Sequence, residues 1–435
     1  MEFFHEEPSA GAIRTARVGV LFDGLLAALG EPKRVLLLPP DSTRSRSGAG
    51  ELTVMLYERL KDQAHVEIMP ALGTHVPMTA DELSGMFPGV PHELFRVHDW
   101  RRGLVRLGEV PGEFVRRVSD GRVGFSVPCE VNRLVVEGGW DRIVSIGQLV
   151  PHEVAGIANH HKNVFVGVGG QETINKTHFL GAVCGMEQAM GRVRTPVRDV
   201  LDYMACHFAR DLPIVYVLSV RARDAQRRLA TRGLYAGDDE ACFLRGAELC
   251  RRMNVDLLDV PVQKAVVYLD PVKFRSAWLG NKAIYRTRMA MADGGELVVL
   301  APGVRCFGED AEIDRLIRKY GYRGTVRVLQ MVEENEDLAG NLSAAAHLIH
   351  GSSEGRFRIT YCAGGLTREE VEGVGFAYGD VEAQMERYPP ASMTPGANVL
   401  ADGEHVFCVP DPAEGLWALR SRFEDSPTSG DTLCG

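Results

Sequence analysis

Short apolar runs alternate with amphipathic segments along the first third of the chain. Residues 35–38 form a continuous apolar run that two prolines end, which is typical of a buried strand. Residues 50–64 then carry apolar side chains at helical spacing, and residues 66–70 are typical of a second strand. Thr79 and Glu82 have the spacing of a capping box, so the pattern predicts strand, helix, strand and a second helix.

The same alternation continues to the end of the chain. We expect further strands over residues 142–147, 163–168, 214–220, 265–269, 296–301, 356–361 and 405–409. We expect further helices over residues 224–230, 238–253, 282–292 and 309–320. This order is typical of α/β folds with parallel sheets. It predicts two α/β domains, at residues 1–265 and 266–420, with an active site in the cleft between them and a flexible tail over 421–435.

Composition restricts the class of protein. The chain has 435 residues, and a length of roughly 150 residues per domain favours more than one domain. A net charge of −9 is unfavourable for a nucleic-acid or anionic-membrane partner, so we expect neither. The first residues are acidic, without the apolar region of a secretory signal, and no apolar run reaches the roughly 18 residues of a membrane span. We therefore expect a cytoplasmic protein.

Polar groups follow three of the predicted strands. Asp41–Arg44, Gly73–His75 and Pro151–His152 each come directly after an apolar run. In parallel α/β folds ligands bind at the carboxyl ends of strands. The pattern therefore predicts that these groups converge.

The segment from His152 to His178 carries the most informative chemistry. It holds His152, Lys162 and His178 on a glycine-punctuated stretch. Imidazoles serve as metal ligands and proton shuttles, and a desolvated lysine amine can become a covalent anchor. A single histidine is more often structural, so the joint spacing carries the interpretation. His160 and His161 either line a pocket or lie in an exposed loop, and we favour the exposed loop.

Together these motifs resemble the nickel-pincer lactate racemase family. Asp41-Ser42-Thr43-Arg44 is similar to the D-x-T-R loop of that family, and Gly73-Thr74-His75 to its G-x-H segment. The chain also keeps the ten-residue step from a catalytic histidine to a lysine, and the sixteen-residue step from that lysine to a metal-binding histidine. The resemblance covers most of the chain and is densest from Pro39 to His178.

The resemblance implies an enzyme that inverts C2 of a 2-hydroxy acid. Its expected cofactor is a pyridinium-type nickel-pincer mononucleotide attached covalently to a lysine, which accepts a hydride reversibly. The expected partners are a small 2-hydroxy acid and the enzymes that build the cofactor. The implied roles are Lys162 as tether, His178 as nickel ligand, His75 and His152 as the acid–base pair, Arg44 as the carboxylate-binding group, and Asp41 as part of the cofactor pocket.

The second predicted domain departs from the family pattern. Where the family often carries Tyr-Gln-x-x-Lys, this chain has Tyr285-Arg286-Thr287-Arg288-Met289. Tyr285 fits and is expected to contact the cofactor, whereas Arg286 replaces the glutamine and Met289 the lysine. An arginine suits a larger or more oxygenated acid, so we favour a sugar acid over lactate, with dicarboxylic hydroxy acids also open. Arg286 and Arg288 point in different directions on a helix, so at most one faces the substrate.

Two other functions remain open from sequence. The first is a zinc-type metallohydrolase, which needs three protein ligands and an open position. The chain has no H-E-x-x-H helix to supply them. The second is a non-catalytic relative that binds an acid or a nucleotide.

Overall fold

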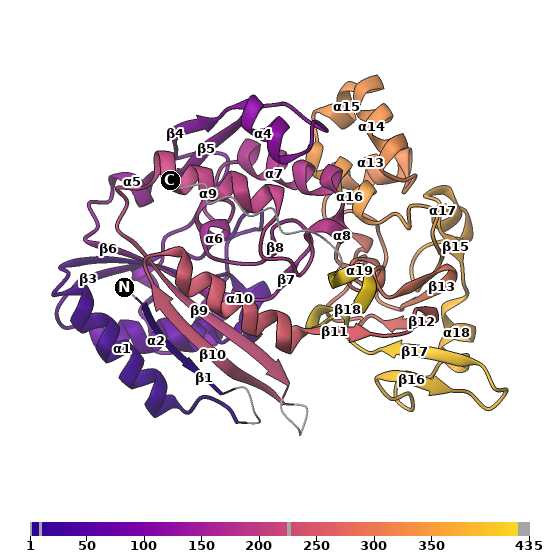
Figure 1. Cartoon of the computed structure of the whole chain (residues 1–435), viewed down its shortest axis with the longest axis horizontal. Helices are drawn as coiled ribbons and strands as arrows, with labels where there is room; N and C mark the ends of the chain where they lie inside the picture. The colour runs from indigo at the N-terminus through magenta and orange to yellow at the C-terminus, as the bar shows by residue number, and fades with distance from the viewer. Residues whose placement is uncertain (1, 8–10, 224–227, 425–435) are drawn as a thin grey trace. The chain divides into compact units, whose positions relative to one another are not determined.

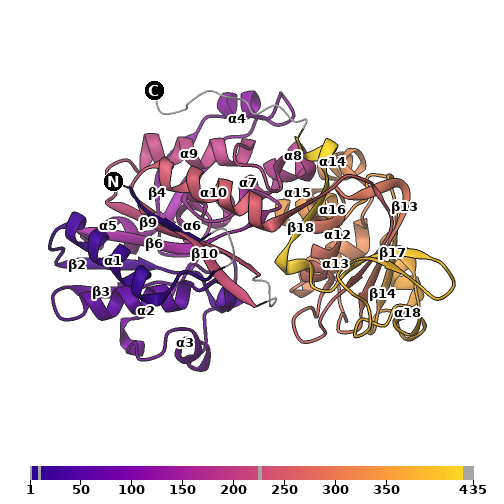
Figure 2. The same cartoon turned by 60° about the horizontal axis from the view of Figure 1, so that its bottom comes forward.

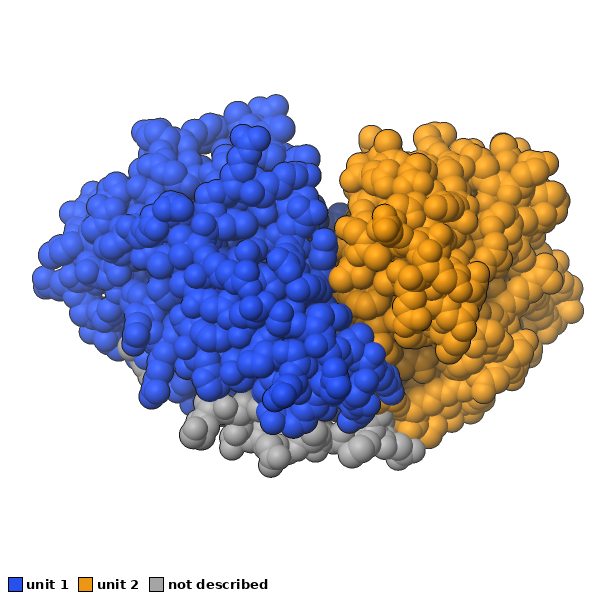
Figure 3. Space-filling model, turned by 90° about the horizontal axis from the view of Figure 1, so that it is seen from above, with its two compact units in different colours: residues 1–177, 189–254, 429–435 blue, residues 178–188, 255–428 orange. Residues whose placement is uncertain are grey.

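The chain divides into two compact units. The computed structural model describes residues 2–7, 11–223 and 228–424. Among these, unit 1 comprises the described residues up to 177 together with 189–254, and unit 2 comprises 178–188 and 255 onward. Figure 3 shows the residues of unit 1 in blue and those of unit 2 in orange.

Unit 1 is built on a six-stranded sheet in the order β1-β10-β9-β6-β2-β3. Strands β9, β6, β2 and β3 are parallel, and β10 and β1 continue the sheet as antiparallel strands. The strands of unit 1 are β1 (Glu2–Glu6), β2 (Arg34–Leu38), β3 (His65–Ile68), β4 (Leu104–Val110), β5 (Val127–Asn132), β6 (Arg142–Leu149), β7 (Pro151–His152), β8 (Gly156–Ile157), β9 (Ile214–Arg223) and β10 (Leu229–Gly237). Strands β4 and β5, and β7 and β8, form separate antiparallel pairs.

Alternating side chains of β2 bury both faces of this sheet. Val35 and Leu37 pack in the core that includes residues of helices α1 and α2, whereas Leu36 and Leu38 pack in a second core with Trp140. Figures 1 and 2 show α1 and α2 on one side of the sheet and α6, α9 and α10 on the other. A strand buried on both faces needs a continuous apolar sequence, and β2 has one.

The helices of unit 1 are mostly connections between strands. They are α1 (Thr15–Leu29), the 3₁₀ helix η1 (Ser42–Ser47), α2 (Ala49–Leu60), α3 (Ala80–Met86), the 3₁₀ helix η2 (His92–Leu94), α4 (Gly112–Val118), α5 (Arg133–Glu137), α6 (His161–Phe165), α9 (Pro196–Phe208) and α10 (Glu240–Asn254). Helix α7 (Gln171–Cys184) begins in unit 1 and ends in unit 2, and α8 (Met186–Ala189) follows it.

Unit 2 has its own six-stranded sheet, in the order β15-β14-β13-β12-β17-β16. All neighbouring pairs are parallel except β16 with β17. The strands of unit 2 are β11 (Val255–Leu258), β12 (Val262–Tyr268), β13 (Met291–Ala301), β14 (Arg358–Ala363), β15 (Ala377–Tyr378), β16 (Gly396–Val399), β17 (His405–Val409) and β18 (Leu416–Leu419). Strands β11 and β18 form a separate parallel pair.

Helices connect the parallel strands of unit 2 as in unit 1. They are α11 (Ala277–Gly280), α12 (Lys282–Thr287), α13 (Ala311–Tyr320), α14 (Thr325–Glu334), α15 (Glu336–Ala339), α16 (Leu342–His350), α17 (Arg368–Gly373), α18 (Val381–Arg387), the 3₁₀ helix η3 (Pro412–Glu414) and α19 (Arg420–Glu424). On one face of the sheet, Val266, Val298 and Leu300 pack in a core with Tyr388, next to α18.

The predicted α/β fold class is confirmed, and the capping box of Thr79 and Glu82 is present at the start of α3. Three local predictions are wrong. Residues 163–168 are not a strand, because the helix α6 occupies residues 161–165. Residues 229–230 belong to strand β10, and 224–227 lie outside the described residues. The helix expected over 282–292 ends at Thr287, and β13 begins at Met291.

The division of the chain differs from the expected boundary at residue 265. Unit 2 consists of two separate segments of the chain: residues 178–188 and the residues from Val255 onward. Of the expected tail, residues 421–424 lie in α19 and 425–435 lie outside the described residues. Within the described part of the chain, no helix combines the length and the apolar character that crossing a bilayer requires.

The side chain of Asn163 joins the start of α6 to two strands. Its amide nitrogen donates to the Leu38 carbonyl and to the Ser145 hydroxyl, both at 3.0 Å. We expect Asn163→Ala to lower the free energy of unfolding by about 1–3 kcal/mol, because it leaves buried polar groups without their partner. Denaturant unfolding followed by circular dichroism measures the loss. The exposed control Arg133→Ala should change stability by less than about 0.5 kcal/mol, and equal effects of the two variants would contradict this role.

Candidate functional site

The carboxyl ends of three neighbouring strands lie side by side in unit 1. Strands β6, β2 and β3 are adjacent and parallel, so the loops that follow them leave the same edge of the sheet. A bridge between Pro40 and Ala71 extends the β2–β3 pairing into those loops. The Gly73 amide then donates to the Gly167 carbonyl just beyond α6, at 2.8 Å. The loops that carry Asp41 and His75 are therefore connected to each other and to the end of α6, the helix that carries Lys162.

Asp41 and His75 form a direct pair. The Nδ1 atom of His75 lies 2.6 Å from Oδ2 of Asp41, and the Thr43 hydroxyl donates to the other carboxylate oxygen at 2.6 Å. Asp41 is 4% exposed, whereas the side chain of His75 is 52% exposed. The carboxylate is held in the interior, and the imidazole that it orients reaches solvent.

The environment of Asp41 keeps its carboxyl group ionised. Burial raises the pKa of Asp41, but the hydrogen bond and charge of His75, the Thr43 hydroxyl and the Arg44 guanidinium lower it, and the net pKa is below the usual value. An ionised carboxylate accepts hydrogen bonds and does not donate them. The Nδ1–H of His75 is therefore the donor, and in the neutral imidazole the Nε2 atom is an acceptor.

The ring nitrogens of His152 have the reverse hydrogen-bond roles to those of His75. It lies in the β7–β8 pair opposite Gly156 and is 6% exposed. Its Nδ1 atom accepts hydrogen bonds from the backbone amides of Val154 at 3.1 Å and Ala155 at 3.4 Å. The tautomer follows from these partners: neutral His152 carries its proton on Nε2. His75 thus offers an acceptor and His152 a donor.

Lys162 lies in the first turn of α6, next to the anchored Asn163. Burial lowers the pKa of Lys162 most strongly, and the Arg44 guanidinium lowers it further. The Glu153 carboxylate opposes both, and the resulting pKa is about 8. Near physiological pH, an amine with such a pKa is in its neutral, nucleophilic form far more often than an ordinary lysine amine is. These interactions also show that Lys162 lies within electrostatic range of Arg44 and of Glu153, the neighbour of His152.

The loop before Lys162 carries an unusual backbone. Asn159 and His160 have φ angles of 67° and 57°, a region that residues with a Cβ atom adopt at a cost of roughly 1–3 kcal/mol each. The His160 ring is 1% exposed, so the interpretation of His160 as an exposed loop residue is wrong. His161 is half-buried, and its Nδ1 atom lies 2.7 Å from Oδ1 of Asp202.

Asp202 was not among the residues singled out from the sequence. It lies on α9, far along the chain from His161, in an ordinary amphipathic stretch without a motif. Arg198, one turn earlier on α9, is also buried and donates to the Ile157 and Asn159 carbonyls at 2.6 and 3.3 Å. Arg198 therefore stabilises the strained loop at Asn159 and His160 through these two hydrogen bonds. No sequence signal indicated this role.

His178, Tyr285 and Arg286 belong to unit 2. His178 is half-buried on α7, at the first residue of that unit. Tyr285 and Arg286 are buried on α12, at 5% and 4% exposure. The Tyr285 hydroxyl lies 2.7 Å from Nδ1 of His347, whose Nε2 atom lies 3.0 Å from the Tyr322 hydroxyl. Burial lowers the pKa of His347 to about 3, with a smaller contribution from His350, so this imidazole is neutral.

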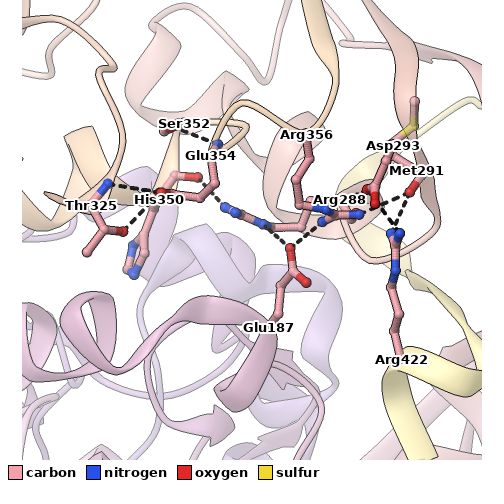
Figure 4. Close-up of polar contacts among 10 residues, drawn as sticks. All are labelled: Glu187, Arg288, Met291, Asp293, Thr325, His350, Ser352, Glu354, Arg356 and Arg422. Atoms are coloured by element: carbon pink, nitrogen blue, oxygen red, sulfur yellow. Dashed lines mark hydrogen bonds and ion pairs between the residues drawn. The ribbon is translucent and has the colours of Figure 1, made fainter. Parts of the chain in front are cut away.

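Arg288 is engaged in an ion-pair network within unit 2. Its Nε atom lies 3.1 Å from Glu187 Oε1, and its Nη1 atom donates to the His350 carbonyl at 3.2 Å. The same Glu187 oxygen lies 2.6 Å from Nη1 of Arg356, and Figure 4 shows this carboxylate between the two guanidinium groups. Arg288 is thus engaged with Glu187 and with the His350 carbonyl.

Comparisons with known proteins agree with the sequence motifs. Residues 23–191 match the family model of the lactate racemase N-terminal domain. The chain is 25% identical over 280 residues to a lactate racemase from Thermoanaerobacterium thermosaccharolyticum, covering 62% of this chain and 60% of that protein. It is 23% identical over 210 residues to a lactate racemase from Lactiplantibacillus plantarum, covering 47% of this chain and 45% of that protein. The matches thus span about half of each curated relative.

Solved structures share the fold. A crystal structure of a protein from Thermotoga maritima superposes with a TM-score of 0.79 at 22% identity, covering 94% of this chain and 100% of that one. The lactate racemase apoprotein from Thermoanaerobacterium thermosaccharolyticum superposes with a TM-score of 0.67 at 17% identity, covering 94% and 90%. The resemblance to the lactate racemase family is confirmed, and the individual residue roles are not tested by these matches.

We expect Lys162 to react with acetic anhydride at lower pH than an ordinary lysine. The midpoint of its labelling should lie near pH 8, as its lowered pKa requires. Arg44→Gln should raise that midpoint, because it removes a neighbouring positive charge. Competitive labelling with mass spectrometry follows each lysine in one sample. Exposed Lys61, whose pKa the Glu58 carboxylate raises, is the internal control, and a shared midpoint for Lys61 and Lys162 would contradict the assignment.

Proposed function

We propose that this chain, a relative of the lactate racemases through its residues 23–191, is a racemase or epimerase that inverts C2 of a 2-hydroxy acid. One observation carries the proposal. A lysine amine of lowered pKa lies in electrostatic range of Arg44 and Asp41, and Asp41 in turn orients the His75 imidazole. A covalent anchor, an anion-binding group and an oriented base are the parts that such a reaction needs.

Inversion of a carbinol centre can proceed through a planar carbonyl compound. A hydride leaves the carbon, a proton leaves the oxygen, and the hydride can return to either face. No side chain accepts a hydride, so a cofactor must do so. Because the two epimers place their hydroxyl groups differently, a second imidazole that holds the substrate oxygen assists the one that takes up its proton.

The two histidines are suited to different tasks by their hydrogen-bond partners. His75 can take the hydroxyl proton at Nε2, because its Nδ1–H is fixed on the ionised Asp41. His152 presents an Nε2–H to a substrate oxygen, because its Nδ1 atom accepts two backbone amides. A neutral imidazole that donates a hydrogen bond stabilises negative charge on an oxygen without itself changing charge.

Arg44 is proposed to bind the substrate carboxylate. It follows β2 in the exposed part of η1, and its charge acts on both Asp41 and Lys162. A guanidinium offers two parallel hydrogen bonds to a carboxylate and keeps its charge at all working pH values. Bound there, the acid is held next to the imidazole of His75.

The residues present fit the expected nickel-pincer nucleotide. Lys162 would hold it covalently, His178 would bind its nickel, and Asp41 and Tyr285 would line its pocket. The fit rests on the donor set, since an amine of lowered pKa beside a guanidinium suits attachment of an anionic nucleotide, and imidazole is an ordinary nickel ligand. When bound, the group supplies reversible acceptance of a hydride. Enzymes that build it are therefore the proposed partners.

The substrate is proposed to be larger and more oxygenated than lactate. Arg286 stands where the family pattern has glutamine, and Arg288 is held by Glu187 and the His350 carbonyl. A buried guanidinium favours additional oxygen atoms on the ligand, and a sugar acid has them. Dicarboxylic hydroxy acids are the second choice.

Two measurements test the function: the mass added to Lys162, and the retention of the C2 hydrogen in the product. Co-expression with cofactor-building enzymes should add mass to the peptide that contains Lys162, together with one nickel per chain. A C2-deuterated sugar acid should keep its deuterium in the epimerised product, whereas carbanion chemistry exchanges it with solvent. Lys162→Ala should abolish the added mass and the activity, and Lys61→Ala should change neither. Full activity of Lys162→Ala would refute the proposal.

The tautomers predict unequal effects of glutamine at the two histidines. His152→Gln keeps an N–H donor and should retain at least about tenfold more activity than His152→Ala, in line with the value of one positioned donor. His75→Gln cannot take up a proton and should lose about 10²–10⁴-fold in kcat, no less than His75→Ala. Steady-state epimerisation of all four variants measures this. Rescue by glutamine at position 75 and not at 152 would contradict the assignment.

A further inference from the structure

Three potential metal ligands meet where α6 begins and α9 passes. One nitrogen of His160, one nitrogen of His161 and one oxygen of Asp202 all lie within 4.8 Å of one another. All three residues belong to unit 1. Four ligands at zinc-bond length stand roughly 3.4 Å apart in a tetrahedron, so a small contraction of this set would enclose an ion.

Several polar atoms of this cluster are buried without a normal hydrogen bond. They are the Oδ2 atom of Asp202, which the Arg194 guanidinium approaches to 3.9 Å, and both ring nitrogens of His160, although the Asp239 backbone lies near enough to that ring to act on it weakly. The His160 ring is enclosed by aromatic rings, with centroids 4.1 Å away in Tyr216 and 4.9 Å away in Phe243. Buried polar groups are normally satisfied, and each exception calls for an explanation.

We propose that His160, His161 and Asp202 bind a divalent cation of the zinc type at a structural site distinct from the proposed nickel centre. The Nδ1 proton that His161 shares with Asp202 occupies the place of the cation in the ion-free protein. Binding displaces that proton from Nδ1, the neutral His161 ring carries it on Nε2 instead, and the imidazole nitrogens and the carboxylate oxygen become ligands. A water molecule completes a four-coordinate shell.

The donor types favour zinc. Two imidazoles and one carboxylate are ordinary zinc ligands. Burial lowers the pKa of His160 well below its usual value, helped by His161 and Arg198 and opposed by the Asp239 backbone, so its ring is in the neutral form that binds metals. Arg198 lies close to the ring and opposes a cation. The carboxylates of Asp202 and of Glu240, which pairs with Arg194 at 2.8 Å, offset that charge.

The burial of the cluster indicates a structural and not a hydrolytic role. With His160 1% exposed and Asp202 5% exposed, a substrate has no room beside the ion. The bound ion would cross-link the loop that precedes Lys162 to α9 and hold His160 in its left-handed conformation. The set therefore gives no support to a zinc hydrolase, and the inference does not depend on the proposed racemase function.

The site is tested by measuring zinc binding to the untagged 435-residue chain. The chain is prepared without cofactor-building enzymes, and bound metal is first removed with a chelator. Titration against a chromophoric chelator should show one zinc per chain with submicromolar affinity, and Co²⁺ in its place should give the intense visible absorption of a tetrahedral site. Asp202→Asn keeps an oxygen for the His161 hydrogen bond but removes the charged ligand. We expect it to weaken zinc binding at least 100-fold.

Two variants serve as matched controls. Asp199→Asn changes a carboxyl group one turn away on the same helix, and His178→Ala removes the proposed nickel ligand; both should keep the zinc. Failure of the wild-type chain to bind stoichiometric zinc would overturn the inference, even if Asp202→Asn did not fold. Loss of zinc in His178→Ala with retention in Asp202→Asn would also overturn it. Neither result depends on racemase activity, because no nickel cofactor is present.

Discussion

The candidate site depends on the parallel pairing of β6, β2 and β3. Parallel neighbours bring their carboxyl ends to one edge of the sheet, so three loops that are distant in sequence leave it together. The Asn163 amide then fixes α6 to this edge through the Leu38 carbonyl and the Ser145 hydroxyl. Without that pairing, the Asp41 carboxylate would not meet His75, and Lys162 would not experience the charge of Arg44.

Much of this arrangement could be predicted from the sequence, because it follows from hydrophobic periodicity. The strands predicted at residues 35–38 and 142–147 are buried apart from the half-buried Arg142, and their ends were expected to deliver polar groups. The groups expected to converge were Asp41–Arg44, Gly73–His75 and Pro151–His152, and the structure pairs Asp41 with His75. The same alternation of strands and helices also predicts the mainly parallel sheet of unit 2.

Other features could not be predicted because they arise from tertiary contacts. Residues 163–168 have a β-rich composition, yet residues 161–165 form α6, and the side chain of Asn163 in that helix has hydrogen-bond partners in two strands. Asp202 carries no local signal, and its pairing with His161 exists only once α9 packs beside α6. The boundary between the units cannot be read from composition either, since a segment of eleven residues, 178–188, joins unit 2 from within the first half of the chain.

The buried imidazole of His347 has a consequence for tolerance of acid. It lies between the hydroxyl groups of Tyr285 and Tyr322, and its folded pKa of about 3 is far below the roughly 6.5 of a histidine in an unfolded chain. Between these two pKa values, His347 is protonated in the unfolded chain but not in the folded chain. The free energy of unfolding therefore declines as the pH falls from about 6.5 to the folded pKa. Asp41 behaves differently, since a lowered carboxyl pKa loses its contribution only in stronger acid. Moderate acidification thus lowers the stability of unit 2 through His347 before it affects the hydrogen-bonded pair of Asp41 and His75.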